Sequence, residues 1–101
     1  MGSFDRMREE VRAFHREHPE VWTLFERFTF DAIRSGYPHF GVGAVWERLR
    51  WETAVNPAYK NSGDFKLNNN YRAFYARRFM RIHPEHDGFF RTRRQTSQSA
   101  S

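Results

Sequence analysis

The chain has 101 residues, a formal net charge of +5, no cysteine, a mean hydropathy of −0.90 and an aromatic content of 18%. This length suits one domain with one core, the aromatic content argues against disorder throughout, and the lack of cysteine excludes disulfides and thiol chemistry. No apolar run approaches the roughly 18 residues of a membrane span and no signal-peptide pattern is present, so we expect a cytoplasmic protein.

Residues 1–17 predict an amphipathic helix that Ser3 can cap. Its narrow apolar stripe consists of Phe4, Met7, Val11 and Phe14. Such a stripe docks on one surface, either within its own chain across Trp22 or Phe74, or in a second copy as a homodimer. We treat these residues as a unit separate from a domain of residues 18–94 and a disordered tail of residues 95–101.

Two further helices are predicted over residues 19–35 and 42–53. The first begins at a proline, which is favoured in a first turn, and Gly36 supplies its left-handed C-terminal cap. The inner stripe of the second consists of Val45, Trp46, Leu49 and Thr53. Residues 55–64 are dense in Asn, Pro, Ser and Gly and therefore predict a long loop.

A last helix is predicted over residues 69–83. Any of Asn68, Asn69 and Asn70 can cap it, and His83 before Pro84 ends it. At 100° per residue, its apolar face consists of Tyr71, Ala73, Tyr75, Ala76, Phe79, Met80 and Ile82. The opposite face consists of Asn70, Phe74, Arg77, Arg78 and Arg81.

Residues 65–67 and 89–93 are too short for helices, and we predict that they form an antiparallel β pair with Asp87-Gly88 as a turn. The fold class is therefore mainly α with a small two-stranded β element, close to a winged helix-turn-helix. Residues 19–35 would be the scaffold, 42–53 the crossing helix and 69–83 the reader. The connection before the reader is longer than usual, and only one strand follows it.

The motifs WERLRWET, FKLNNNY, YARRFM, HPE and GFFRTR occur in this order. With them, residues 25–93 resemble a family of small bacterial and prophage proteins that has no assigned biochemical function. The resemblance implies a mobile-element context and a shared fold. It implies no catalytic or binding residues.

The charge lies in the second half of the chain, since residues 51–101 carry nine basic and four acidic side chains while residues 1–50 carry eight of each. This asymmetry indicates an anionic partner, and we expect double-stranded DNA bound by a small regulator. Arginine can pair with guanine or phosphate and asparagine with adenine. The expected contacts on the reader are Asn70, Arg77, Arg78 and Arg81. The alternative is a solvated helix face whose arginines lie over aromatic rings and carboxylates.

Further phosphate contacts are expected from Lys66, Arg91, Arg93 and Arg94. The alternative is an edge strand that its charges protect from aggregation. The Asn68-Asn69-Asn70 run is best explained as a cap with turn residues, and base reading by one of them is the lesser alternative.

A rival hypothesis is a protein-interaction module, such as a mobile-element inhibitor of a host or defence protein. Exposed aromatic side chains would then anchor the partner, with Phe74, Trp51 and Tyr59 as candidates. RNA binding ranks third, because no aromatic pair is clearly placed for base stacking.

No enzyme, metal site or cofactor is expected. His83 and His86 are three residues apart, but Pro84 breaks the helix that would align them and no third ligand is identifiable. No catalytic motif is present, and the carboxylates are scattered.

Overall fold

The computed structural model describes residues 3–60 and 67–91, and the side chains of residues 6–59 and 67–91. The described part contains five α-helices, α1 (Ser3–Glu17), α2 (Pro19–Arg34), α3 (Val42–Val55), α4 (Pro57–Lys60) and α5 (Arg72–Ile82). Two 3-10 helices, η1 (Asn69–Tyr71) and η2 (Pro84–His86), flank α5. The predicted mainly helical class is therefore confirmed. No helix of the described residues is long and apolar enough to cross a membrane.

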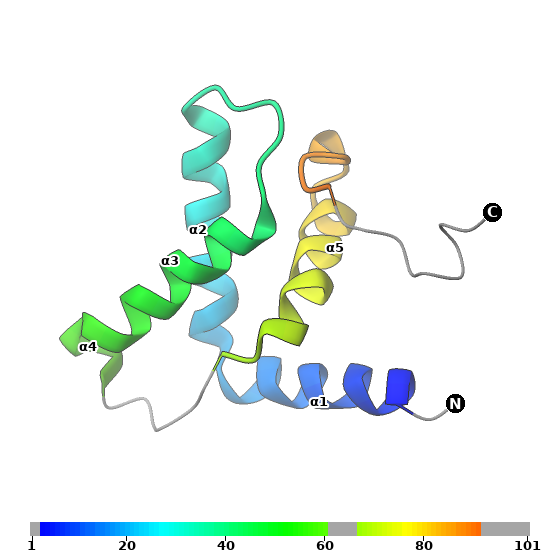
Figure 1. The fold of residues 1–101 in the computed structure, drawn as a ribbon, viewed down its shortest axis with the longest axis vertical. Coiled ribbons are helices and arrows are strands. Elements are labelled where there is room, and N and C mark those ends of the chain that lie inside the picture. Colours follow the sequence, from blue (N-terminus) through cyan, green and yellow to red (C-terminus); the bar gives the residue numbers. More distant parts are fainter. Residues whose placement is uncertain (1–2, 61–66, 92–101) are drawn as a thin grey trace.

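The helices pack around α2 (Figure 1). α2 and α5 run side by side in the same direction, α3 crosses in front of α2, and α1 lies across the N-terminal ends of α2 and α5. The ends of α2 agree with the sequence prediction, since Pro19 stands in its first turn and Gly36 adopts a left-handed φ of 98° after its last. This arrangement leaves one side of α5 facing away from the core.

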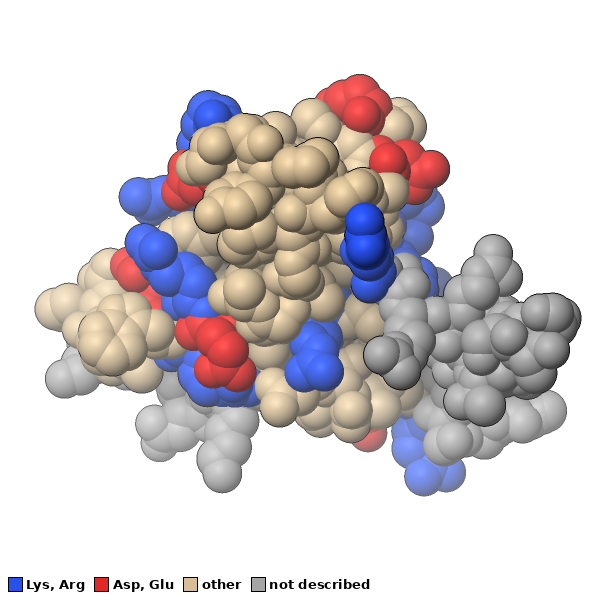
Figure 2. Space-filling view, turned by 45° about the horizontal axis from the view of Figure 1, so that its top comes forward, with Lys and Arg blue, Asp and Glu red and all other residues tan. Residues whose placement is uncertain are grey.

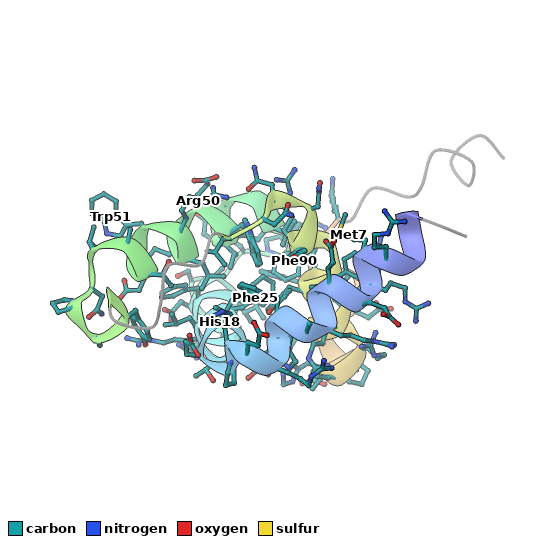
Figure 3. The ribbon with its side chains drawn as sticks, turned by 90° about the horizontal axis from the view of Figure 1, so that it is seen from below. Met7, His18, Phe25, Arg50, Trp51 and Phe90 are labelled. Carbon is teal, nitrogen blue, oxygen red and sulfur yellow. The ribbon has the colours of Figure 1, made fainter. Side chains whose placement is uncertain are left out.

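Phe25 of α2 lies at the centre of the core (Figure 3). Its ring centroid is 5.6 Å from those of Tyr75 and Phe90, and 6.2 Å from that of Trp46. Phe25 and Trp46 are completely buried. Aromatic side chains predicted for the inner faces of three different helices therefore meet at one point, and their packing fixes the relative positions of α2, α3 and α5.

The apolar stripe of α1 packs into this same core. Val11 is 7% exposed, Met7 and Phe14 lie against the buried cluster, and the Phe14 ring is 5.3 Å from that of Tyr71. The side chain of Phe4 lies outside the described residues. The described part of α1 thus packs within its own chain, as in the intramolecular alternative. The division into residues 1–17, 18–94 and 95–101 stays a prediction. The homodimer stays a prediction that would require Met7, Val11 and Phe14 to leave this core.

Two predictions for the chain between α3 and α5 need correction. α3 extends to Val55, and the first part of the predicted loop forms α4. The reason is local, because the Asn56 side chain accepts a hydrogen bond from the Ala58 N–H at 2.9 Å and Pro57 starts the helix. A further correction concerns the other end of α5. Ile82, which the sequence predicts to be buried, is 44% exposed, because it is the last residue of α5 and the chain turns into η2 directly after it.

The predicted β pair is not seen among the described residues, which include Leu67 and Phe89–Arg91 but not residues 65, 66, 92 and 93. Phe90 instead forms an isolated parallel bridge with Phe40, supported by a 3.1 Å hydrogen bond from the Phe40 N–H to the Phe89 carbonyl. The segment after α5 therefore pairs with the α2–α3 connection.

Candidate nucleic-acid interface

The start of α5 is fixed by the asparagines that precede it. The Asn68 side chain accepts a hydrogen bond from the Asn70 N–H at 2.9 Å and caps η1. The predicted cap is therefore present, but on this 3-10 helix; α5 itself begins only at Arg72, with Tyr71 at its N-cap and no side-chain cap. The Asn69 side chain binds Arg50. Asn70 is exposed. Two of the asparagines therefore shape the backbone, and the side chain of Asn70 lies on the surface in η1, just before α5.

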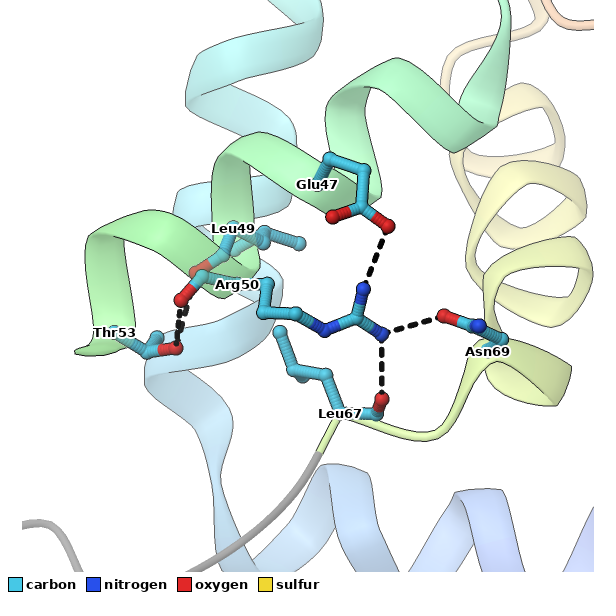
Figure 4. A network of polar contacts seen from close by, with 6 residues as sticks. All are labelled: Glu47, Leu49, Arg50, Thr53, Leu67 and Asn69. Carbon is cyan, nitrogen blue, oxygen red and sulfur yellow. Dashed lines mark hydrogen bonds and ion pairs between the residues drawn. The ribbon is translucent and has the colours of Figure 1, made fainter.

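Arg50 joins α3 to this start (Figure 4). Its Nη2 donates to the Leu67 carbonyl at 2.9 Å and to Asn69 Oδ1, and its Nη1 donates to Glu47 Oε2 at 2.6 Å. Hydrogen bonds from a charged donor are stronger than neutral ones, so this network anchors the entry into α5. Sequence analysis misses Arg50, because no local pattern relates α3 to residues 67 and 69.

α5 differs from the other long helices in charge. It carries four arginines and no carboxylate. α1 carries four of each, α3 carries two of each, and α2 carries two arginines and three carboxylates. Within the described residues, no arginine of α5 forms an ion pair. α5 is therefore the most positively charged of the four long helices, and its arginines are not held in ion pairs among the described residues.

The arginines of α5 have different environments. The Arg78 guanidinium lies 4.9 Å from the centre of the Trp22 indole, and its Nε is buried with no partner among the described residues. The Arg77 guanidinium lies 5.7 Å from the centre of the Phe74 ring, and Arg81 is exposed. The alternative prediction of arginines over aromatic rings thus describes Arg78 well and Arg77 in part. We define the outer face of α5 as Asn70, Phe74, Arg77 and Arg81.

A groove of about 390 Å³ lies beside this face, between the end of α5 and η2. We call it the α5–η2 groove, and it is lined by Arg77, Met80, Arg81, Pro84 and Asp87. Met80 is held by the Gly88 N–H, which donates to its Sδ at 3.2 Å. Gly88 has a φ of 90°, the left-handed conformation that the sharp turn requires. The groove therefore places two arginines one helical turn apart on an apolar base.

The wall of this groove is tied to α2 by His83. Its Nε2 donates to Glu26 Oε2 at 2.8 Å, and its ring packs edge-on against Phe30 with centroids 5.0 Å apart. His83 also ends α5, as its position before Pro84 predicts. The end of α5 and the turn into η2 are thus held to the core at a fixed angle.

The remaining predicted contacts lie apart from the groove or outside the described residues. Arg91 is exposed, while Lys66, Arg93 and Arg94 lie outside the described residues, as does the predicted tail. Of the predicted partner-binding residues, Trp51 is 64% exposed and points away from α3 (Figure 3), whereas Phe74 and Tyr59 pack partly against the core. Tyr59 lies on α4 and not on a loop.

A second hollow of about 280 Å³ lies between α2 and α3. Its lining includes Tyr37, Phe40, Asp31 and Arg48. The Arg48 guanidinium lies 4.7 Å from the centre of the Phe28 ring, and Tyr37 is largely exposed.

On the face shown in Figure 2, charged side chains surround a broad surface of other residues. Charge of one sign does not gather there, unlike on α5.

Titratable groups meet where α1 packs on α5. The pKa of His15 lies below its ordinary value of 6.5, because burial and then the Arg78 charge disfavour the imidazolium. Burial raises the pKa of Tyr75, whose hydroxyl has no partner among the described residues. Among the described residues, no group of three or more histidine or carboxylate side chains is placed to hold a metal ion.

Compared with protein families, curated proteins and solved structures, the chain shows no match. The resemblance to small prophage proteins is neither confirmed nor contradicted and stays a prediction. Function must therefore be argued from the charge and shape of the described surface.

Proposed function

We propose that this protein binds double-stranded DNA through the outer face of α5. The supporting observation is the charge of that helix, which carries four arginines, no carboxylate and, among the described residues, no ion pair. Association with DNA is driven largely by release of counterions from the phosphates, and unpaired exposed arginines provide the charge that this requires.

In this proposal α2, α3 and α5 take the places of the scaffold, crossing and reader helices of a helix-turn-helix protein. α3 and α5 are then joined through α4 and the following residues and not by a tight turn. A wing would have to come from the chain around Phe89 and Phe90, whose pairing with Phe40 is limited to one bridge. A regulatory role in a bacterial or phage genome belongs to the same proposal.

The test is fluorescence anisotropy with duplex fragments from mixed genomic DNA, over a range of salt concentrations. We expect apparent affinity to fall steeply as salt rises. Arg81→Gln should weaken binding, whereas Arg34→Gln on α2 removes the same charge from an arginine paired with Asp31 and should not. Binding weaker than micromolar at low salt would refute the proposal.

A second candidate is a protein-interaction module, favoured by exposed apolar residues on α3. Trp51 and Val55 are both exposed and lie one helical turn apart. An exposed tryptophan is a common anchor in protein interfaces. Affinity purification with and without nuclease separates the candidates, because a stoichiometric protein that survives nuclease and is lost in Trp51→Ala supports the module.

A further inference from the structure

We infer that the α5–η2 groove seats a backbone phosphate of the duplex between Arg77 and Arg81, so that these two arginines contribute affinity without sequence preference. The inference rests on the proposed function and assigns a contact type to two of its residues.

The shape of the site favours phosphate over base edges. Phosphates project from the duplex, whereas base edges lie at the bottom of its grooves and are reached by elements that protrude. Arg77 and Arg81 line a shallow hollow that is largely open to solvent, with Met80, Pro84 and Asp87 as its other lining residues. A recess with arginines on its wall fits a projecting anionic group.

The position of α1 supports the same assignment. A recognition helix contacts base edges mainly with its N-terminal residues. In this fold α1 lies across the N-terminal end of α5 (Figure 1), where Phe14 packs against Tyr71 at 5.3 Å between ring centroids. α1 therefore covers Tyr71 at the N-terminal end of α5, while Arg77 and Arg81 lie toward the other end of the helix, away from this contact.

The chemistry of the two arginines suits a phosphate. A guanidinium can donate two parallel hydrogen bonds to phosphate oxygens. Arg77 is oriented by Phe74 at 5.7 Å, and neither arginine has an ion-pair partner among the described residues. Asp87 also lines the groove but makes no ion pair with them. Its carboxylate would repel a bound phosphate, so it limits affinity.

The experiment measures binding of the intact chain and its variants to several short duplexes of unrelated sequence. We expect Arg77→Gln and Arg81→Gln each to lower affinity roughly fivefold by the same factor on every duplex, and to reduce the magnitude of the salt slope by about 1. Asp87→Asn should raise affinity roughly two- to fivefold at low salt, and less at high salt. Arg34→Gln is the matched control for loss of charge and should change affinity less than about twofold. Circular dichroism confirms that each variant is folded.

Three results would overturn the inference. If losses in Arg77→Gln and Arg81→Gln differ strongly between duplexes, the arginines read bases. If the chain binds DNA and both variants bind as well as the intact chain, the contact lies elsewhere. If the intact chain binds no duplex at low salt, the proposed function fails and the inference with it.

Discussion

The guanidinium of Arg78 lies 4.9 Å from the centre of the Trp22 ring and connects the middle of α5 to α2. Its Nε is buried, so part of this arginine belongs to the interior of the fold. A guanidinium on an indole face stabilises through the ring quadrupole and through packing of its aliphatic stem. Arg78 therefore differs from Arg81, although both belong to the same charged helix.

We predict that Arg78→Ala lowers the free energy of unfolding by about 1–2 kcal/mol through lost cation–π contact and packing. Arg81→Ala, at an exposed position, should cost less than about 0.5 kcal/mol. Urea unfolding followed by circular dichroism measures both losses. The tryptophan emission of the folded protein, to which Trp22, Trp46 and Trp51 contribute, should change in Arg78→Ala and not in Arg81→Ala. Equal, small effects of the two substitutions would show that Arg78 is also a surface arginine.

His15 should make stability depend on pH. Because its pKa is lowered in the fold, the unfolded chain takes up the proton more readily. The stabilising contribution of His15 to the free energy of unfolding is therefore complete above pH 6.5, the ordinary pKa of histidine. This contribution is lost as the pH falls below that value.

Unfolding free energies measured from pH 8 to pH 5 should thus fall more in the intact chain than in His15→Gln. His39→Gln changes an exposed histidine of the α2–α3 connection and serves as the control. If the intact chain and His15→Gln had the same pH dependence, the proposed environment of His15, between Trp22, Tyr75 and Arg78, would be wrong.

The Arg50 network should contribute to stability mainly through its backbone contact. Arg50→Met keeps the aliphatic stem but leaves the Leu67 carbonyl without its 2.9 Å donor, and we expect a loss of about 1–3 kcal/mol. Glu47→Gln removes only an exposed ion pair and should cost less than about 0.5 kcal/mol. Chemical denaturation of both variants shows whether the backbone contact or the ion pair contributes more to stability. Equal losses would assign the stability to the ion pair.

Thr29 is completely buried, and its hydroxyl has no partner among the described residues. Because an unpaired buried hydroxyl costs free energy, Thr29→Val should leave stability unchanged or raise it by up to about 1 kcal/mol. Thr53 is the matched control, since its hydroxyl donates to the Leu49 carbonyl at 3.0 Å and Thr53→Val should not stabilise. A clear loss of stability in Thr29→Val would indicate an ordered water that satisfies the hydroxyl.

The helices could be predicted because their ends carry strong local signals. Pro19 begins α2, Gly36 follows its end, and His83 before Pro84 ends α5. α4 could not be predicted in this way, because Asn56-Pro57 is as typical of a turn as of a capped helix. The difference lies in one side-chain hydrogen bond, from the Ala58 N–H to Asn56.

The candidate site could be predicted only in part. Helical spacing places Asn70, Arg77 and Arg81 on one face, but it also places Arg78 with them. The position of Arg78 depends on Trp22, which is brought close only by the packing of α5 on α2. Met80 and Asp87 join the groove because the chain turns back after Pro84, and a one-dimensional pattern contains no information on that turn.

The docking of α1 leads to a last prediction. Val11 is buried in the core of its own chain, so Val11→Ala should lower the free energy of unfolding by about 1–3 kcal/mol. Arg12→Ala, on the exposed side of α1, is the control and should cost less than about 0.5 kcal/mol. Because the contact is intramolecular, the unfolding midpoint should not depend on protein concentration. A chain lacking residues 1–17 should unfold or aggregate, since Tyr71 and Tyr75 lose their cover. Light scattering on both chains completes the test. A dimeric intact chain with a folded, monomeric truncation would assign α1 to a homodimer interface instead.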